Sequence, residues 1–226
     1  MENNYKNIYL FFVAILLLVP IGFKSYFTKL INSENIEYVL HFHTILMTSW
    51  CLILIVQPIL IIKNKRSIHK LLGRLSYVIF PIITISIFFV MFYSFNRMSS
   101  VLTEEDNLSQ IFLPTSQLFL FVLFYVLAII NVKKPHIHMR YIIVSSIALF
   151  GPTIGRIDFG IEEVNADLWF MSFCVLSFLI YEKFKKGIYK PFLLGFVTFV
   201  VIHIANVSFT YSIIWQNVAK IIFIKT

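Results

Sequence analysis

Long apolar runs separated by short polar segments occupy most of the sequence between residues 8 and 211. A helix that crosses about 30 Å of hydrocarbon needs roughly 20 mainly apolar residues. Seven runs contain no Asp, Glu, Lys or Arg and predict seven membrane-spanning helices: Ile8–Phe23, Val39–Ile62, Leu75–Phe95, Ile111–Val132, Tyr141–Ile154, Leu168–Tyr181 and Phe192–Tyr211. The fifth and sixth runs are short, so we expect their helices to continue about one turn beyond these limits. No run alternates apolar and polar residues as a barrel strand does, which predicts an all-α, polytopic membrane helical bundle.

The composition indicates the same class of protein. Of the 226 residues, 59% are apolar and 13% are charged, whereas about a quarter of the residues in a soluble domain are charged. The mean hydropathy of +0.85 excludes a soluble globular fold and a disordered chain. Because the sequence contains no linker and no internal repeat, we expect a single integral-membrane domain over residues 1–226.

The charges between the runs predict the orientation of the chain. Every second inter-span segment is basic, and these segments hold 12 of the 19 basic residues and one acid: 63–74, 133–140 and 182–190. The alternate segments hold four basic residues and nine of the eleven acids: 24–38, 97–110 and 155–167. Basic segments stay in the cytoplasm, so we expect the N-terminus inside and the C-terminus outside a bacterial cytoplasmic (inner) membrane. The net charge of +8 then reflects topology and attraction to anionic lipid. The expected partner is the lipid bilayer, and no nucleic acid is needed.

Four of the six histidines are candidate ligands. Imidazole is the commonest neutral metal ligand and also binds haem iron. With a rise of ~1.5 Å per residue, His43 lies about 7 Å and His203 about 12 Å below the outer edge of a ~30 Å core, so these two could face each other. His69 and His138 begin the third and fifth spans at the cytoplasmic side and form a second expected pair. The two levels differ by most of the membrane thickness, so all four histidines cannot share one centre.

Each candidate histidine also has a simpler interpretation. A histidine near a membrane interface can be solvated or hydrogen-bonded to a carbonyl without any further role, and this stays open for His43, His69 and His138. It also stays open for His203, but burial without a role is harder to explain there, because this residue is deeper and lipid offers no hydrogen-bond partner. The remaining two histidines, His41 and His136, lie nearer the water and are not candidates.

Three stretches of the chain carry recognisable boxes. The string HFHTILMTSW (41–50), followed by Gln57-Pro58, has the pattern H-x3-M/L-x2-W with a terminal glutamine, and RSIHKLLGR (66–74) is close to H-R-x-L-G. The stretch from Lys134 to Tyr141, continuing to Arg156, is close to H-K-R-L-M with a terminal P-x3-R. Together, over about residues 39–157, they resemble a set of uncharacterised bacterial multi-pass membrane proteins. The chain departs from the boxes at Lys70 and Met139. The resemblance implies a helical bundle similar to those that hold b-type haem between histidines of neighbouring helices.

Two functions of different classes remain open at this stage. The first is electron transfer across or within the membrane through b-type haem, with a redox partner and the ligands His43, His69, His138 and His203. In that case the basic side chains at the cytoplasmic rim, Lys70, Arg74 and Arg140, would pair with haem propionates. The second is a non-redox membrane protein that binds zinc or copper through the same histidines, or an assembly factor or subunit that acts through a partner. The sequence predicts no catalytic residue.

Overall fold

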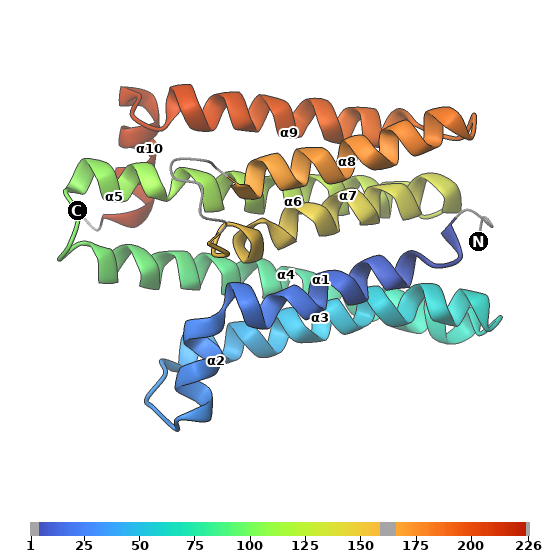
Figure 1. Ribbon diagram of the computed structural model, residues 1–226, viewed down its shortest axis with the longest axis horizontal. Helices are drawn as coiled ribbons and strands as arrows, with labels where there is room; N and C mark the ends of the chain where they lie inside the picture. Colours follow the sequence, from blue (N-terminus) through green and yellow to red (C-terminus); the bar gives the residue numbers. More distant parts are fainter. Residues whose placement is uncertain (1–4, 159–165, 225–226) are drawn as a thin grey trace. The chain divides into compact units, whose positions relative to one another are not determined.

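The computed structural model describes residues 5–158 and 166–224, and within these ranges it contains ten α-helices and no β-strand (Figure 1). The expected all-α fold is therefore confirmed for the described residues. Each apolar run predicted as a span lies on a helix: α1 (Ile8–Gly22), α3 (Tyr38–Ile62), α4 (Arg66–Met98), α6 (Phe112–Ile130), α7 (Pro135–Ile154), α8 (Ala166–Phe184) and α9 (Lys190–Phe209). The helices of the two short runs, α7 and α8, extend beyond the predicted limits as expected.

Three shorter helices lie outside the predicted spans. They are α2 (Lys24–Ile31), α5 (Glu104–Gln110) and α10 (Ile213–Phe223). Helix α2 follows α1 after a bend of 69°, and α5 continues into α6 to form one helical stretch, Glu104–Ile130. Among the described residues, five helices are long and apolar enough to cross a membrane, or six if the bent pair of α1 and α2 is one span. These helices indicate a multi-pass membrane protein.

The basic segment between the second and third predicted spans is mostly helical. Residues 66–74 form the first turns of α4, which has 33 residues and would be about 50 Å long at 1.5 Å per residue. His69 and Arg74 therefore lie on a helix that begins before the apolar run. Likewise, His136 lies on a helix, as the second residue of α7.

The chain forms two compact units, residues 1–90 and 91–226, with the boundary inside α4. The single domain expected over residues 1–226 stays a prediction. In the first unit α1 packs along α3, burying Ile8, Phe12 and Ile15, which share one face of α1. Helix α3 contacts α4 through the rings of Trp50 and Phe80, whose centroids are 6.0 Å apart.

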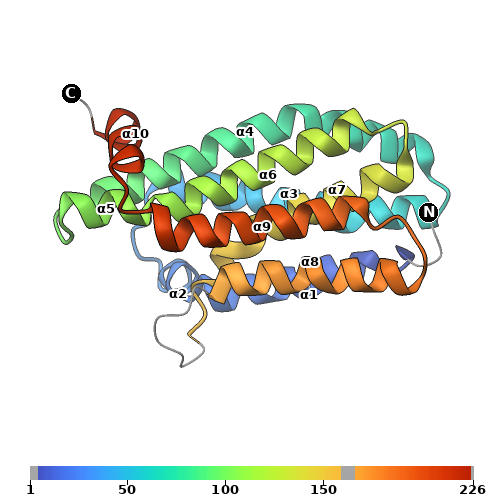
Figure 2. The same ribbon diagram turned by 90° about the horizontal axis from the view of Figure 1, so that it is seen from above.

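The second unit is built around a bundle of α6, α7, α8 and α9. Both views show these four helices running side by side (Figures 1 and 2). Helix α7 packs against each of the other three, and 67% of its most apolar stretch is buried, compared with 17% for α9. Helix α7 is therefore the centre of this bundle. The exposed face of α9 carries large apolar side chains, as lipid contact requires: Leu193, Leu194, Val197, Val201, Ile204 and Val207.

Three helices end in the same type of cap without glycine. The residue after the last turn has a left-handed backbone, and the next amide bonds to the carbonyl five residues earlier, which is the pattern of a Schellman cap. The left-handed residues are Ser33 (φ 54°), Asn64 (φ 57°) and Lys186 (φ 52°). The closing bonds are 2.9 Å from Glu34 to Lys29, 2.8 Å from Lys65 to Leu60, and 2.8 Å from Gly187 to Glu182. The last two caps lie at the turns from α3 to α4 and from α8 to α9.

Candidate functional site

A buried polar cluster lies in the second unit, where α6, α8 and α9 meet near the end of α7. Nε2 of Gln117 on α6 donates a 2.6 Å hydrogen bond to Oδ2 of Asp167 in the first turn of α8. The two side chains are only 5% and 3% exposed. An ionisable side chain buried in a membrane bundle is costly, so it marks a candidate functional site.

His203 on α9 belongs to this cluster. It interacts electrostatically with Asp167, and its ring lies 4.8 Å from the ring of Trp169, tilted by 59°. Among the described residues, Nδ1 of His203 has neither solvent access nor a hydrogen-bond partner. Arg156, which is exposed, also interacts electrostatically with Asp167, and its Nη1 donates to the carbonyl of Pro152 at 2.6 Å. The buried site thus combines an imidazole, a carboxylate and an amide.

The backbone of α7 approaches this cluster closely at Gly151. A Cβ atom there would lie 2.6 Å from Nε2 of Gln117 and 2.9 Å from Sδ of Met171. Both distances are shorter than van der Waals contact. Because Gly151 has no Cβ atom, the Gln117 amide can lie against the backbone of α7 in the position from which it bonds to Asp167.

His43, on α3 in the first unit, is oriented by Ser86 on α4. Oγ of Ser86 donates to the carbonyl of Ile83 at 2.8 Å, and it lies 3.0 Å from Nδ1 of His43. A hydroxyl has a single proton. When Ser86 gives it to the Ile83 carbonyl, Nδ1–H of His43 donates to Ser86, and the lone pair of the neutral ring is on Nε2.

His138, near the start of α7, shows the same tautomer with a stronger constraint. Its Nδ1 lies 2.8 Å from the carbonyl oxygen of Ala128 on α6. A carbonyl only accepts, so Nδ1–H of His138 must donate, and the lone pair of the neutral ring is on Nε2. Metal-ligating histidines have this arrangement, in which the second nitrogen donates to a carbonyl or carboxylate.

The other predicted residues have different surroundings. His69 is half-buried on α4, and its backbone carbonyl accepts a 3.3 Å hydrogen bond from Nε2 of Gln57. Arg74 is exposed on the same helix. Arg140 is 1% exposed and forms an ion pair with Glu182 on α8, with Nη2 and Oε1 2.6 Å apart. The guanidinium of Arg140 is therefore engaged inside the second unit and does not lie at an open rim.

Within each unit the predicted histidines lie far apart. In the first unit His43 faces Ser86, which lies 17 residues and about 25 Å along α4 from His69. In the second unit His138 lies near the start of α7, while His203 lies with Asp167 and Gln117 near the start of α8 and α6. Each predicted pair takes one histidine from each unit, so the pairings stay predictions.

Metal-binding side chains do not gather into larger sets in the described part of the chain. Among those residues, no group of three or more His, Cys, Asp or Glu side chains could hold a metal ion. Cys51 and Cys174 are both free thiols, the first buried and the second half-buried.

Sequence reasoning missed three residues that the structure places in buried polar contacts: Gln117, Asp167 and Glu182. The two acids were counted with the inter-span segments. A signal existed for Glu182, because it is the only acid in the three basic segments. Asp167 directly precedes an apolar run, but an exposed loop residue can have the same position. Nothing in the sequence links Asp167 to Gln117, which is 50 residues away.

The fold and the buried polar side chains define a multi-pass helical membrane protein with oriented histidines in both units. No protein-family model, curated protein or solved structure that we compared with the chain matches it. The resemblance to the bacterial multi-pass proteins with histidine boxes stays a prediction.

Proposed function

We propose that the protein is a seven-span protein of the bacterial cytoplasmic membrane that holds b-type haem through histidines and transfers electrons across or within the membrane. One observation carries the proposal: Nδ1–H of His138 donates to the Ala128 carbonyl at 2.8 Å. This bond fixes the ring and leaves Nε2 as the basic nitrogen, as a histidine that binds haem iron would need. The hydrogen bond of His43 to Ser86 supports it independently in the first unit.

Bound haem would supply one-electron chemistry, and the role of this chain is to hold and surround it. The pairing of His43 with His203, and of His69 with His138, follows from their depths along the predicted spans. Arg74 is exposed and available for a propionate. Arg140 could take that role only by giving up its ion pair with Glu182, so we assign it a structural role in this proposal.

The test is the visible spectrum of the protein purified in mild detergent, with haem quantified as the pyridine complex. We expect a Soret band and α and β bands that sharpen on reduction with dithionite. His138→Ala should lose haem. His136→Ala is the matched control, because it removes an exposed histidine from the same helical turn and leaves the His136 carbonyl that binds Arg140. A colourless, folded protein that takes up no added haem contradicts the proposal, and so does equal haem content in the two variants.

A second candidate function has its own supporting observation. A hydrolytic zinc site normally includes a carboxylate or a general base beside the metal. His203 contacts Trp169, two residues from Asp167 on α8. This favours a non-redox protein that binds zinc or copper through Asp167 and His203. The same preparation distinguishes the two functions: one equivalent of zinc or copper without haem, lost in both His203→Ala and Asp167→Asn, supports the metal site. Haem that is retained in Asp167→Asn supports the redox proposal.

A further inference from the structure

Helix α10 has three distinct sides. With successive residues about 100° apart around a helix, Trp215, Ala219 and Phe223 share one side, and all three are buried. Gln216, Asn217 and Lys220 form a polar flank next to it, which also carries the exposed Ile213 at the start of the helix. Ile214, Val218, Ile221 and Ile222 form an apolar flank on the opposite edge, which covers about 100° of the circumference.

The buried side docks α10 firmly on the second unit. Nε1 of Trp215 donates a 2.9 Å hydrogen bond to the carbonyl of Leu108 on α5, and its ring packs edge-on against Phe112, with centroids 4.9 Å apart. The ring of Phe223 lies 5.5 Å from that of Phe95. These contacts fix which way the two flanks face.

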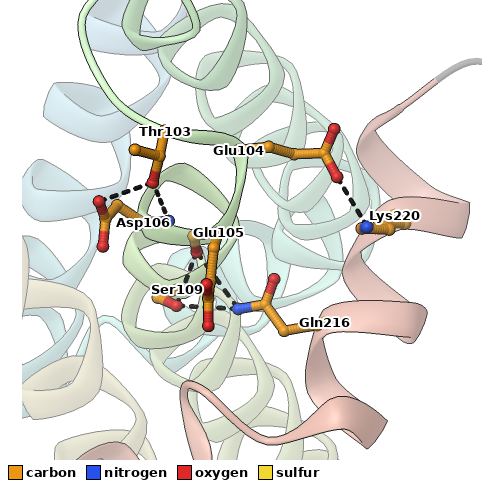
Figure 3. A network of polar contacts seen from close by, with 7 residues as sticks. All are labelled: Thr103, Glu104, Glu105, Asp106, Ser109, Gln216 and Lys220. Atoms are coloured by element: carbon orange, nitrogen blue, oxygen red, sulfur yellow. Dashed lines mark hydrogen bonds and ion pairs between the residues drawn. The ribbon is translucent and has the colours of Figure 1, made fainter.

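The polar flank faces the acidic first turn of α5 (Figure 3). Nε2 of Gln216 donates to Oγ of Ser109 at 2.9 Å, and Nζ of Lys220 lies 2.7 Å from Oε1 of Glu104. Both members of the Lys220–Glu104 pair are about half exposed, so this flank lies where charged groups keep contact with water.

The apolar flank, in contrast, has no partner among the described residues that covers it. Ile214 is 65% and Ile221 is 82% exposed, and Val218 and Ile222 are each more than 40% exposed. The end of α9 also exposes apolar side chains, among them Val207, which is 70% exposed. Such a contiguous apolar surface on a chain with lipid-facing helices fits acyl chains.

The length and direction of α10 exclude another span. Eleven residues rise about 16 Å, roughly half of a ~30 Å core. Helix α10 also runs crosswise to α9 in both views (Figures 1 and 2). A short helix with one polar and one apolar edge, lying across the end of a span, has the properties of an interfacial helix.

We propose that α10 lies in the plane of the membrane at the boundary where α9 ends, with its apolar flank among phospholipid acyl chains and its polar flank among headgroups and water. The occupant of the apolar flank is therefore lipid. The proposal rests on the membrane location of α9, but it does not depend on a cofactor or on which side of the membrane this boundary lies.

The test measures the depth of fluorescent labels in vesicles of phosphatidylcholine and phosphatidylglycerol. Single cysteines are introduced at exposed positions in a Cys51→Ala, Cys174→Ala background and labelled with an environment-sensitive dye: Ile221→Cys on the apolar flank and Asn217→Cys on the polar flank. Val201→Cys, 55% exposed near the middle of α9, is the span control. The quenchers are phospholipids brominated either near the carbonyl end or near the methyl end of the acyl chain.

We expect the Ile221 label to be quenched more strongly by the shallow bromines, the Asn217 label to be quenched by neither, and the Val201 label to be quenched best by the deep bromines. Equal, weak quenching at Ile221 and Asn217 together with strong quenching at Val201 overturns the interfacial helix and leaves the span intact. Weak quenching at all three positions overturns the membrane location itself. Energy transfer between Ile221 labels that disappears when the protein is diluted in lipid, without quenching by bromines, assigns the flank to a second copy of this chain and also overturns the proposal.

Discussion

The Arg140–Glu182 pair is the most buried charged contact that the structure describes, with both side chains 1% exposed. Three donors of Arg140 are used: Nε and Nη2 bind Oε1 of Glu182, and Nη1 donates to the carbonyl of His136 at 2.7 Å. The pair joins the start of α7 to the end of α8. Such a pair adds little net stability when it is complete, but removal of one partner leaves an uncompensated buried charge.

We therefore predict that Arg140→Ala destabilises the folded protein by about 3–5 kcal/mol. The double variant Arg140→Met, Glu182→Leu should cost less than this single substitution, because it leaves no buried charge. The measurement is the free energy of unfolding in mixed micelles, and Lys220→Ala, which breaks the half-exposed pair with Glu104, should change it by less than about 1 kcal/mol. A double variant that is as unstable as Arg140→Ala contradicts the prediction.

Gly187 lies against Glu182 of the same ion pair. A Cβ atom on Gly187 would lie 1.9 Å from Oε2 of Glu182. This carboxylate cannot simply turn away, since its other oxygen is held by Arg140. Gly187→Ala should therefore destabilise the protein by about 1–3 kcal/mol, the usual cost of overpacking a buried site.

The matched control for this substitution is Gly73→Ala on α4. The nearest atom to its new Cβ would be Nε2 of Gln57 at 3.9 Å, an ordinary contact distance. Since alanine is the better helix former, Gly73→Ala should leave the stability unchanged or raise it by up to about 1 kcal/mol. Thermal unfolding of both variants in one detergent compares them directly, and equal loss in the two would show that the Gly187 contact is not the cause.

At the scale of single elements, α5 depends on its N-cap. Oγ1 of Thr103 accepts from the amide of Asp106 at 3.2 Å and donates to Oδ2 of the same residue at 2.7 Å (Figure 3). Three acids in the first turn, Glu104, Glu105 and Asp106, also suit the positive end of the helix dipole. Helix α5 continues into α6 at its other end, so the Thr103 cap supports the free end of α5, where Lys220 of α10 contacts Glu104.

We predict that Thr103→Ala lowers the local stability of α5 by about 1 kcal/mol. The measurement is amide hydrogen exchange, which should become faster in α5 and also in α10, because Trp215 and Gln216 bond to α5. Thr115→Ala on α6 is the control: its hydroxyl donates only to the carbonyl of Ile111 four residues earlier. Faster exchange in α5 with unchanged exchange in α10 would contradict the coupling of the two helices.

At the scale of the whole molecule, the seven-span topology with the N-terminus inside stays a prediction from the distribution of charge. Cysteines at Ser67 and Ser100, both exposed, test it in intact cells with a membrane-impermeant maleimide. We expect labelling at position 100 and none at position 67 until the cells are opened. Labelling at position 67 from outside would overturn the orientation.

Particular residues show which features of the candidate site could be predicted from the sequence. His43 and His138 were singled out from spacing alone, and the structure adds a partner for each, Ser86 and the Ala128 carbonyl, and the tautomer of His138. Arg140 was assigned to an open rim because only its position in the sequence was visible. Its partner Glu182 is 42 residues away and comes near it only when α7 packs against α8.

The sequence by itself determined where seven of the helices lie, because apolar runs without charge depend only on local composition. It also determined that the protein belongs to the membrane class. Only the tertiary structure decided that α7 is the centre of its bundle, that Asp167 is buried with Gln117, and that α10 docks on α5. Each of these features joins residues that are distant in sequence. Their burial and hydrogen bonds exist only once the helices pack, so no local pattern of hydrophobic and polar positions encodes them.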